Sequence, residues 1–522
     1  MYYPSIFNDV IGPVMRGPSS SHCAAALRIG RLARDLMNGR IEQVSIEFDP
    51  NGSLATTHTS QGSDMGLFGG FLGWEATDER LVASAKAIEE AGIKVDFHIV
   101  DYGANHPNTY KLTLQNNEDW HSLIAISVGG GMIEVLEIDG SPVSIAGDYF
   151  ETLIYVDDNA NEILQYLCEI IAADQILLHG VPGKQFIEIK SQSFLGDQLS
   201  SDLLLRFKAH SVRQLSPVLP VLSHQNIRVP FISCEEMLEY NTGKDLALWE
   251  LAVCYESARG NLSHAQVVEK MRDIVIILET SIQQGIRGTR FADRILGNQT
   301  SQFQSLMQDK KLLESGMLNQ MILFVTAMME VKSSMGVIVA SPTAGACGGL
   351  PGACIGAARS MGLSLEETTR AMLAAGLIGI FIAAHATFAA EVGGCQAECG
   401  SGSGMAAAAL VSLANGTAKQ AVDASSMALQ NVLGMICDPV ANRVEVPCLG
   451  KNVLAASNAL ACANMALAGF DAVIPLDEVI ETMDRVGKSI PSELRCTALG
   501  GLSITKTSKA IEERLQRASN PD

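Results

Sequence analysis

Aromatic side chains are scarce in this sequence, where Phe, Trp and Tyr make up only 5% of the 522 residues. Basic residues are also few. The 37 Lys and Arg are outnumbered by 57 Asp and Glu, which gives a formal net charge of −20. A chain with this charge is repelled by nucleic acids and by anionic membrane surfaces, so we expect neither as a partner. The core must be built from Ala, Val, Ile, Leu and Met, over roughly two to four domains.

Signals for export or membrane insertion are missing as well. The sequence begins Met1-Tyr2-Tyr3-Pro4-Ser5, without a basic segment followed by an apolar run, so no signal peptide is predicted. One apolar stretch, from Ala371 to Ala390, is rich in Ala and Gly. We interpret it as a buried helix rather than a membrane span. These features predict a cytoplasmic protein.

The C-x-x-C pairs of common zinc modules and ferredoxins are absent, although the chain has 12 cysteines. A disulfide framework is not expected in a cytoplasmic chain. Several late cysteines adjoin Gly or Pro, so they stand in turns where thiolates can converge. No His is close to them, which favours an iron–sulfur cluster or a structural zinc, with buried structural cysteines as the alternative. The eight cysteines after residue 340 are Cys347, Cys354, Cys395, Cys399, Cys437, Cys448, Cys462 and Cys496.

Residues 1–150 alternate strand-like and helix-like segments, which indicates an α/β or α+β domain. Residues 43–48 and 94–100 alternate polar and apolar side chains as half-buried strands do. Residues 79–91 predict a helix, and the glycines at 129–131 predict the turn of a hairpin.

The rest of the chain divides into three parts. Residues 151–190 follow a strand, helix, strand pattern and resemble a small ACT-like βαβ module. Residues 191–235 contain Gln, Ser and Pro and predict a linker. Residues 236–522 consist of long helical segments, such as 246–258 and 263–284, followed by helices rich in Ala and Gly. The predicted fold is therefore multidomain, an α/β domain with an ACT-like module followed by a large all-α catalytic domain.

Two hydroxyl-rich loops are candidates for binding a small anion. Gly17-Pro18-Ser19-Ser20-Ser21-His22 precedes a predicted helix, so its hydroxyls can cap that helix or hold a carboxylate. Ser341-Pro342-Thr343-Ala344-Gly345 is a turn whose backbone N–H groups can cradle a carboxylate or a phosphate. The second loop lacks the Lys-Ser or Lys-Thr of a P-loop, and its helical surroundings do not fit a dinucleotide fingerprint.

These loops, taken in order with three cysteine motifs, resemble the iron–sulfur-dependent L-serine dehydratases. The cysteine motifs are Gly394-Cys395-Gln396-Ala397-Glu398, Cys437-Asp438-Pro439 and Val446-Pro447-Cys448. Asn105-His106-Pro107-Asn108-Thr109 and the segment Glu493–Gly501 extend the resemblance over nearly the whole chain. Some members keep the β and α parts as separate subunits, and here the parts would be fused with β first.

The resemblance implies that Cys395, Cys437 and Cys448 hold three irons of a [4Fe–4S] cluster, with the fourth iron open to substrate. It implies conversion of L-serine to pyruvate and ammonia, with iron as a Lewis acid. The substrate-binding residues would be Ser19, Ser20, Ser21, Ser341, Thr343, Ala344 and Gly345. We expect no pyridoxal phosphate, because neither Lys332 nor Lys451 has a phosphate-cradling context. The family also implies a homodimer.

Some family members close the fourth iron site with a C-terminal cysteine. This sequence ends Ser519-Asn520-Pro521-Asp522, so we do not expect that contact. Cys399 and Cys496 are possible substitutes, and we interpret both as bystanders.

One departure from the family concerns the catalytic base. Where the family often has Gly-His-x-Thr-Asp, this chain has Ser60-Gln61-Gly62-Ser63-Asp64. A glutamine cannot take up a proton, so His58 or His22 becomes the candidate base. Two other functions stay open, a lyase of the same architecture that acts on L-threonine or L-cysteine, and a non-catalytic sensor of an amino acid or of the cluster.

Overall fold

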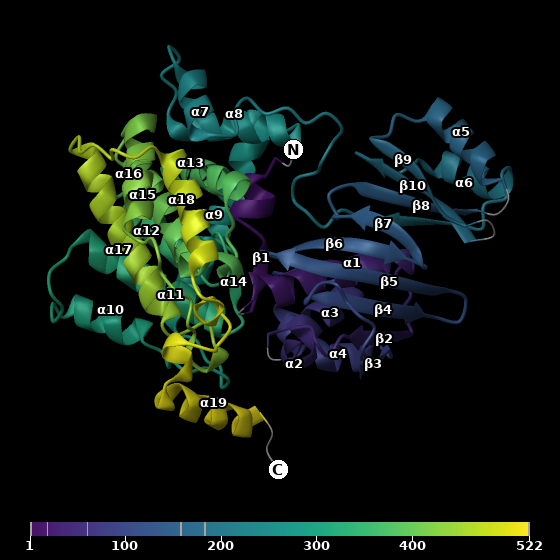
Figure 1. Ribbon diagram of the computed structural model, residues 1–522, viewed down its shortest axis with the longest axis horizontal. Coiled ribbons are helices and arrows are strands. Elements are labelled where there is room, and N and C mark those ends of the chain that lie inside the picture. Colours follow the sequence, from purple (N-terminus) through teal and green to yellow (C-terminus); the bar gives the residue numbers. More distant parts are fainter. Residues whose placement is uncertain (1–2, 18, 60, 157–158, 182–183, 520–522) are drawn as a thin grey trace. The chain divides into compact units, whose positions relative to one another are not determined.

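Residues 19–227 fold around two β-sheets, and residues 228–522 fold together with residues 1–18 into a unit made mostly of helices (Figure 1). We call these the sheet unit and the helical unit. The structure is a computed structural model and describes residues 3–17, 19–59, 61–156, 159–181 and 184–519. The first 18 residues, which the sequence places in the N-terminal domain, thus belong to the helical unit.

The first sheet of the sheet unit has six strands in the order β3-β2-β4-β5-β6-β7. Only β2 and β3 run parallel to each other; the other neighbours are antiparallel. Helices α1 and α3 pack together, and α1 contacts β5 and β6. The strands are β2 (Gln43–Phe48), β3 (Lys94–Ile99), β4 (Thr109–Gln115), β5 (Trp120–Gly129), β6 (Met132–Ile138) and β7 (Ser141–Ile145), and the helices are α1 (Ala25–Leu36), α2 (Leu54–Thr57), α3 (Ser63–Phe71) and α4 (Ser84–Glu90).

The predicted hairpin is confirmed. Strands β5 and β6 pair on either side of three glycines, with Gly129 opposite Met132. Gly129, Gly130 and Gly131 have φ angles of 105°, 61° and 84°, a region that residues with a Cβ rarely adopt. The turn therefore depends on glycine.

The second sheet has four antiparallel strands in the order β11-β8-β10-β9. Its chain order is strand, helix, two strands, helix, strand, the arrangement known as a split βαβ fold. The predicted module of residues 151–190 covers only part of it. The elements are β8 (Phe150–Val156), α5 (Ala160–Ile170), β9 (Gln175–Val181), β10 (Lys184–Ser191), α6 (Asp197–Leu205) and β11 (Ser211–Leu215).

The structure differs from the predicted linker over residues 191–235, since α6 and β11 lie within it. Leu203 is fully buried, and Phe207 and Ala209 pack in the same core. Exposed Leu204 and Leu205 stand between these positions and hide the pattern of burial in the sequence. These buried positions anchor the second half of the sheet.

The helical unit contains one short β-ribbon, in which β1 (Val14–Arg16) pairs antiparallel with β12 (Val337–Val339). The helices predicted at 246–258 and 263–284 are confirmed as α8 and α9. The unit comprises α7 (Cys234–Asn241), α8 (Leu248–Gly260), α9 (His264–Arg287), α10 (Thr300–Gln308), α11 (Met317–Ser333), α12 (Gly349–Met361), α13 (Leu365–His385), α14 (Ala390–Gly393), α15 (Ser401–Leu413), α16 (Ala418–Gln430), α17 (Cys448–Leu467), α18 (Leu476–Ser489) and α19 (Lys506–Ser519).

Helix α13 contains most of the apolar stretch noted in the sequence. In the part of the chain that the structure describes, it is the one helix long and apolar enough to cross a membrane. Within its 18-residue apolar window, 78% is buried inside the protein, as in a core helix. Gly376 of this helix leaves room for Ile6, because a Cβ there would lie 2.7 Å from the Ile6 side chain.

A buried carboxylate fastens the N-terminal segment to the helical unit. Glu256 of α8 is fully buried and accepts hydrogen bonds from Ser5 Oγ at 2.5 Å and from the Ile6 amide at 2.8 Å. The neighbouring Tyr255 hydroxyl donates to the Pro4 carbonyl at 2.9 Å. Burial raises the pKa of Glu256 to about 7, against these hydrogen bonds and the charge of Arg259.

Glu256→Gln is expected to flatten the pH dependence of stability. The folded pKa of about 7 exceeds the ordinary 4.5, so the protonated group stabilises the fold fully below pH 4.5. That contribution is lost as the pH rises through about 7, and it amounts to at most about 3 kcal/mol. The unfolding temperature of the wild type should therefore fall more steeply between about pH 5 and 8 than that of the variant.

The control is Glu89→Gln, at an exposed position of α4. Its unfolding temperature should fall with pH as steeply as that of the wild type. Equal slopes for Glu256→Gln and the wild type would contradict the assignment.

Candidate functional site

Five cysteines from separate segments meet at one place in the helical unit. Cys395 precedes the single helical turn Gln396–Gly400 before α15, Cys399 lies within that turn, and Cys448 is the first residue of α17. Cys437 and Cys496 lie on two segments that pair in parallel, and the Cys496 amide donates to the Cys437 carbonyl at 2.8 Å. This pairing brings the segment 490–500 to the other cysteines.

Hydrogen bonds link the thiols into a chain. Cys395 contacts the thiols of Cys399 and Cys437, and Cys437 also contacts Cys496. The two thiol donors hold the pKa of Cys395 well below its usual range, with a further contribution from the charge of Lys451. The corresponding pKa values of Cys399 and Cys437 are raised. These hydrogen bonds therefore favour the thiolate form of Cys395.

Two lysines supply positive charge around these thiols. Burial raises the pKa of Cys448, and the charge of Lys332 opposes that rise. Lys332 is itself 1% exposed and donates to the Val444 carbonyl. Lys451 donates to Asp438 Oδ1 at 2.9 Å. In the sequence both lysines were considered only as sites for pyridoxal phosphate, and no local pattern indicated this role.

The structure brings the predicted ligands Cys395, Cys437 and Cys448 together and adds Cys399 and Cys496. Among the described residues, no group of three or more His, Cys, Asp or Glu is arranged to hold a single metal ion. The donors are nevertheless all soft thiols beside two lysines, and this chemistry fits an anionic iron–sulfur cluster.

The predicted substrate loop lies next to these thiols. It leads from β12 to α12, and its residues Ser341, Thr343 and Ala344 are buried. The Thr343 hydroxyl donates to Glu398 Oε1 at 2.6 Å. Burial, with the charge of Cys395, raises the pKa of Glu398 to about 8. In the sequence, the position of Glu398 three residues after Cys395 was the one indication of this role.

Gly345 leaves room for the Glu398 carboxylate, because a Cβ there would lie 3.1 and 3.3 Å from its two oxygens. Gly345→Ala should therefore displace Glu398 by a few tenths of an ångström and disturb Thr343. We expect kcat/KM to fall about tenfold and the unfolding free energy to fall by about 1 kcal/mol. Steady-state kinetics and thermal unfolding measure these effects.

Gly402→Ala is the matched control, since its Cβ would lie 3.8 Å from Pro342 of the same loop, an ordinary contact. Equal kinetics for the two variants would contradict the role of Gly345.

The other predicted site residues belong to the sheet unit, and Pro18 and Ser60 of their motifs lie outside the described residues. Ser20 and Ser21 lie in a π-helical turn before α1, and Ser19 precedes it. Ser19 makes no capping hydrogen bond; its Oγ lies 2.9 Å from His22 Nδ1. Simple helix capping therefore does not explain Ser19.

His22 is engaged at both ring nitrogens. Its Nε2 lies 3.1 Å from Thr57 Oγ1, which donates its own proton to the Ser53 carbonyl at 2.6 Å. Nε2 must then be the donor, which leaves Nδ1 to accept from Ser19. Burial lowers the pKa of His22 to about 4, so His22 is neutral and a weak base.

His58 is held differently. Its Nδ1 lies 2.6 Å from Asp64 Oδ1, and its ring stacks on Phe97 with centroids 5.1 Å apart. The carboxylate orients the ring and favours the tautomer with its proton on Nδ1. In this tautomer Nε2 carries the lone pair, as a general base requires.

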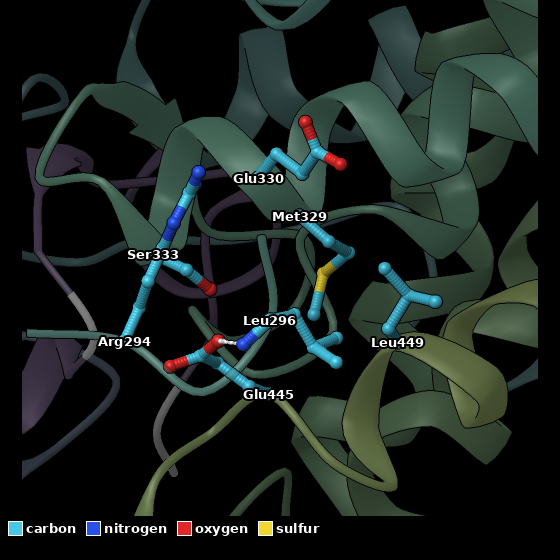
Figure 2. A pocket seen from close by; sticks show the side chains of 7 residues that line it. All are labelled: Arg294, Leu296, Met329, Glu330, Ser333, Glu445 and Leu449. Atoms are coloured by element: carbon cyan, nitrogen blue, oxygen red, sulfur yellow. Dashed lines mark hydrogen bonds between the residues drawn. The ribbon is translucent and has the colours of Figure 1, made fainter. Parts of the chain in front are cut away.

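A small pocket lies beside the start of α17 (Figure 2). It encloses about 230 Å³ of space between atoms, part of it open to solvent. Figure 2 shows Glu330 and Glu445 on opposite sides, with Glu445 bonded to the Leu296 amide at 3.0 Å. None of the predicted substrate residues lines this pocket, so we do not assign it to the substrate. Its lining residues are Arg294, Leu296, Met329, Glu330, Ser333, Glu445 and Leu449.

Comparison with known proteins adds independent evidence. The profile of a family described as "Serine dehydratase alpha chain" matches residues 243–503. A "Probable L-serine dehydratase, alpha chain" from Bacillus subtilis (strain 168) is 35% identical over 285 residues, which are 55% of this chain and 95% of the relative. A "Probable L-serine dehydratase, beta chain" from the same organism is 39% identical over 163 residues, 31% of this chain and 73% of the relative.

A single-chain relative is also similar. "L-serine dehydratase 1" from Escherichia coli (strain K12) is 31% identical over 286 residues, 53% of this chain and 63% of that protein. The chain thus combines parts similar to an alpha and a beta chain that are separate in Bacillus subtilis.

Proposed function

Because the chain belongs to the serine dehydratase alpha chain family, we propose that it removes water and then ammonia from L-serine and releases pyruvate. The observation that carries this proposal is the meeting of buried thiols with a hydroxyl-bearing loop. Cys395 and Cys437 are hydrogen-bonded to each other, and Glu398, three residues after Cys395, accepts from Thr343. The proposed metal ligands and the proposed substrate loop are thus close together.

We propose that Cys395, Cys437 and Cys448 hold a [4Fe–4S] cluster. When bound, the cluster supplies a Lewis-acidic iron that polarises the β-hydroxyl of the substrate. Lys332 and Lys451 offset the negative charge of the thiolates, since the charge of each lysine acts on one of these cysteines. The thiolates can then remain ionised in a buried site.

The Thr343 hydroxyl would contact the ammonium group of the substrate. Its single proton is donated to Glu398, so its oxygen can only accept a hydrogen bond from another group. This assignment differs from the sequence-based expectation that the loop containing Thr343 binds an anionic group. The carboxylate remains assigned to Ser19, Ser20 and Ser21, while Ser341, Ala344 and Gly345 shape the loop.

His58 is the proposed base. It takes the α-proton of L-serine, and loss of the β-hydroxyl as water leaves aminoacrylate. The imine form of aminoacrylate hydrolyses to pyruvate and ammonium. His22 is the weaker candidate because its lone pair on Nδ1 already accepts from Ser19 and its pKa is about 4.

Anaerobic purification followed by iron analysis, a visible spectrum and a pyruvate assay tests the proposal. We expect the broad absorbance of an iron–sulfur cluster and pyruvate from L-serine. Iron without pyruvate, but with turnover of L-threonine or L-cysteine, would indicate another substrate. A spectral response to amino acids without turnover would indicate a sensor, and protein without iron would overturn the mechanism.

We also propose that the enzyme is a cytoplasmic homodimer. Association would bury exposed apolar side chains such as Phe470, Val473 and Leu499, which are 55%, 80% and 65% exposed. Sedimentation of the purified protein tests the oligomeric state, and a monomer at micromolar concentration would contradict it.

A further inference from the structure

One buried amide joins the substrate loop to the cysteine site. Asn452 of α17 is fully buried, and its Oδ1 accepts hydrogen bonds from the amides of Gly348 and Gly349 at 3.1 and 2.8 Å. These amides stand at the start of α12, where no carbonyl of the helix itself can accept them. Asn452 therefore caps α12 from a different helix.

The other end of the same amide bonds to the site. Its Nδ2 donates to the Gly345 carbonyl and to the Cys448 carbonyl, each at 2.9 Å, and lies 3.6 Å from Cys399 Sγ. Gly345 ends the substrate loop, and Cys448 is a proposed cluster ligand. A single planar group thus fixes the loop, the start of α12 and the start of α17 relative to one another.

We propose that Asn452 is a positioning residue that holds the substrate loop in register with the cluster. The inference rests on the proposed function, and it adds a residue that touches neither substrate nor iron. Only an amide supplies both the acceptor for Gly348 and Gly349 and the donor for Gly345 and Cys448. Removing it takes the acceptor from the Gly348 amide and the donor from the Gly345 carbonyl, and lets the loop shift against the thiols.

The test compares Asn452→Ala with Asn458→Ala on the same helix. Asn458 is also well bonded, since it accepts from Asn431 at 2.8 Å and donates to Ser403 at 3.0 Å and to the Ala428 carbonyl at 2.9 Å. None of these partners is a proposed site residue. Both variants lose a side-chain amide from α17, but only Asn452→Ala removes the hydrogen bonds that hold the substrate loop.

We expect kcat/KM for L-serine to fall about 100-fold in Asn452→Ala, because a displacement of about 1 Å can cost that much. Iron per chain should stay near the wild-type value, since every thiol remains. Hydrogen exchange at residues 341–349 should become faster. Asn458→Ala should change the unfolding temperature alone.

Equal kinetics and equal loop exchange in the two variants would overturn the proposal. If Asn452→Ala does not fold, Asn452→Asp decides, because it keeps the acceptor and replaces the donor. It should show the faster loop exchange and the loss of kcat/KM. If the wild type releases no pyruvate, the proposed function fails, and exchange at residues 341–349 alone then decides whether Asn452 positions the loop.

Discussion

Cys437→Ala is expected to remove bound iron and abolish pyruvate formation. The thiol of Cys437 lies between those of Cys395 and Cys496, so its loss breaks the chain of sulfur contacts. We expect activity to fall by more than about 100-fold, since residues that only orient metal ligands already change metal affinity by about 10–100-fold. Iron analysis, the visible spectrum and the pyruvate assay of the anaerobic protein measure the effect.

Cys354→Ala is the matched control. Cys354 lies fully buried in α12, and its pKa is raised by burial rather than by the thiols of the site. This variant loses the same atom from an equally apolar place and should keep iron and activity at a small cost in stability. Cys437→Ala with a full complement of iron would rule out Cys437 as a ligand.

The local elements of the fold could be predicted from the sequence. Residues 43–48 form β2 as predicted, because alternate side chains of this strand face one core. The helix predicted at 79–91 begins as the 3₁₀ turn Glu79–Ala83 and continues as α4. Amphipathic periodicity is enough to predict a helix or strand when one of its faces packs against one core.

Pairings between distant segments could not be predicted in this way. Val14 pairs with Val339, which moves the N-terminal segment into the helical unit, and no local pattern records such a contact. Strand β9 was missed as well, because it alternates only weakly and is largely half-exposed.

In the candidate site, too, local features could be predicted from the sequence and contacts between distant segments could not. The type and neighbours of Cys395, Cys437 and Cys448 indicated metal binding, and these residues do converge. The contact of Cys496 with Cys437 depends on backbone pairing between remote segments. Asn452 had no signal in the sequence, since its importance comes from five hydrogen-bonding partners that only the fold brings together.

His58→Asn is expected to lower kcat by about 10²–10⁴-fold, the usual contribution of a general base. Asparagine keeps a polar side chain at the position but cannot take up the α-proton. Asp64→Asn should lower kcat less, because His58 remains but loses the carboxylate 2.6 Å from Nδ1 that fixes its tautomer. Both variants should retain iron, and both should slow the exchange of the α-deuterium of labelled L-serine with water.

The control is His98→Asn, because His98 is exposed on β3 next to Phe97, which stacks on His58. His98→Asn removes an imidazole from the same neighbourhood and should leave kcat unchanged. Exchange of the α-deuterium separates a base from a structural residue, since only loss of the base slows that exchange while iron is retained. A His58→Asn enzyme with wild-type kcat would contradict the assignment. The α-proton would then be taken by a group other than His58, and His58 would not replace the histidine that is Gln61 in this chain.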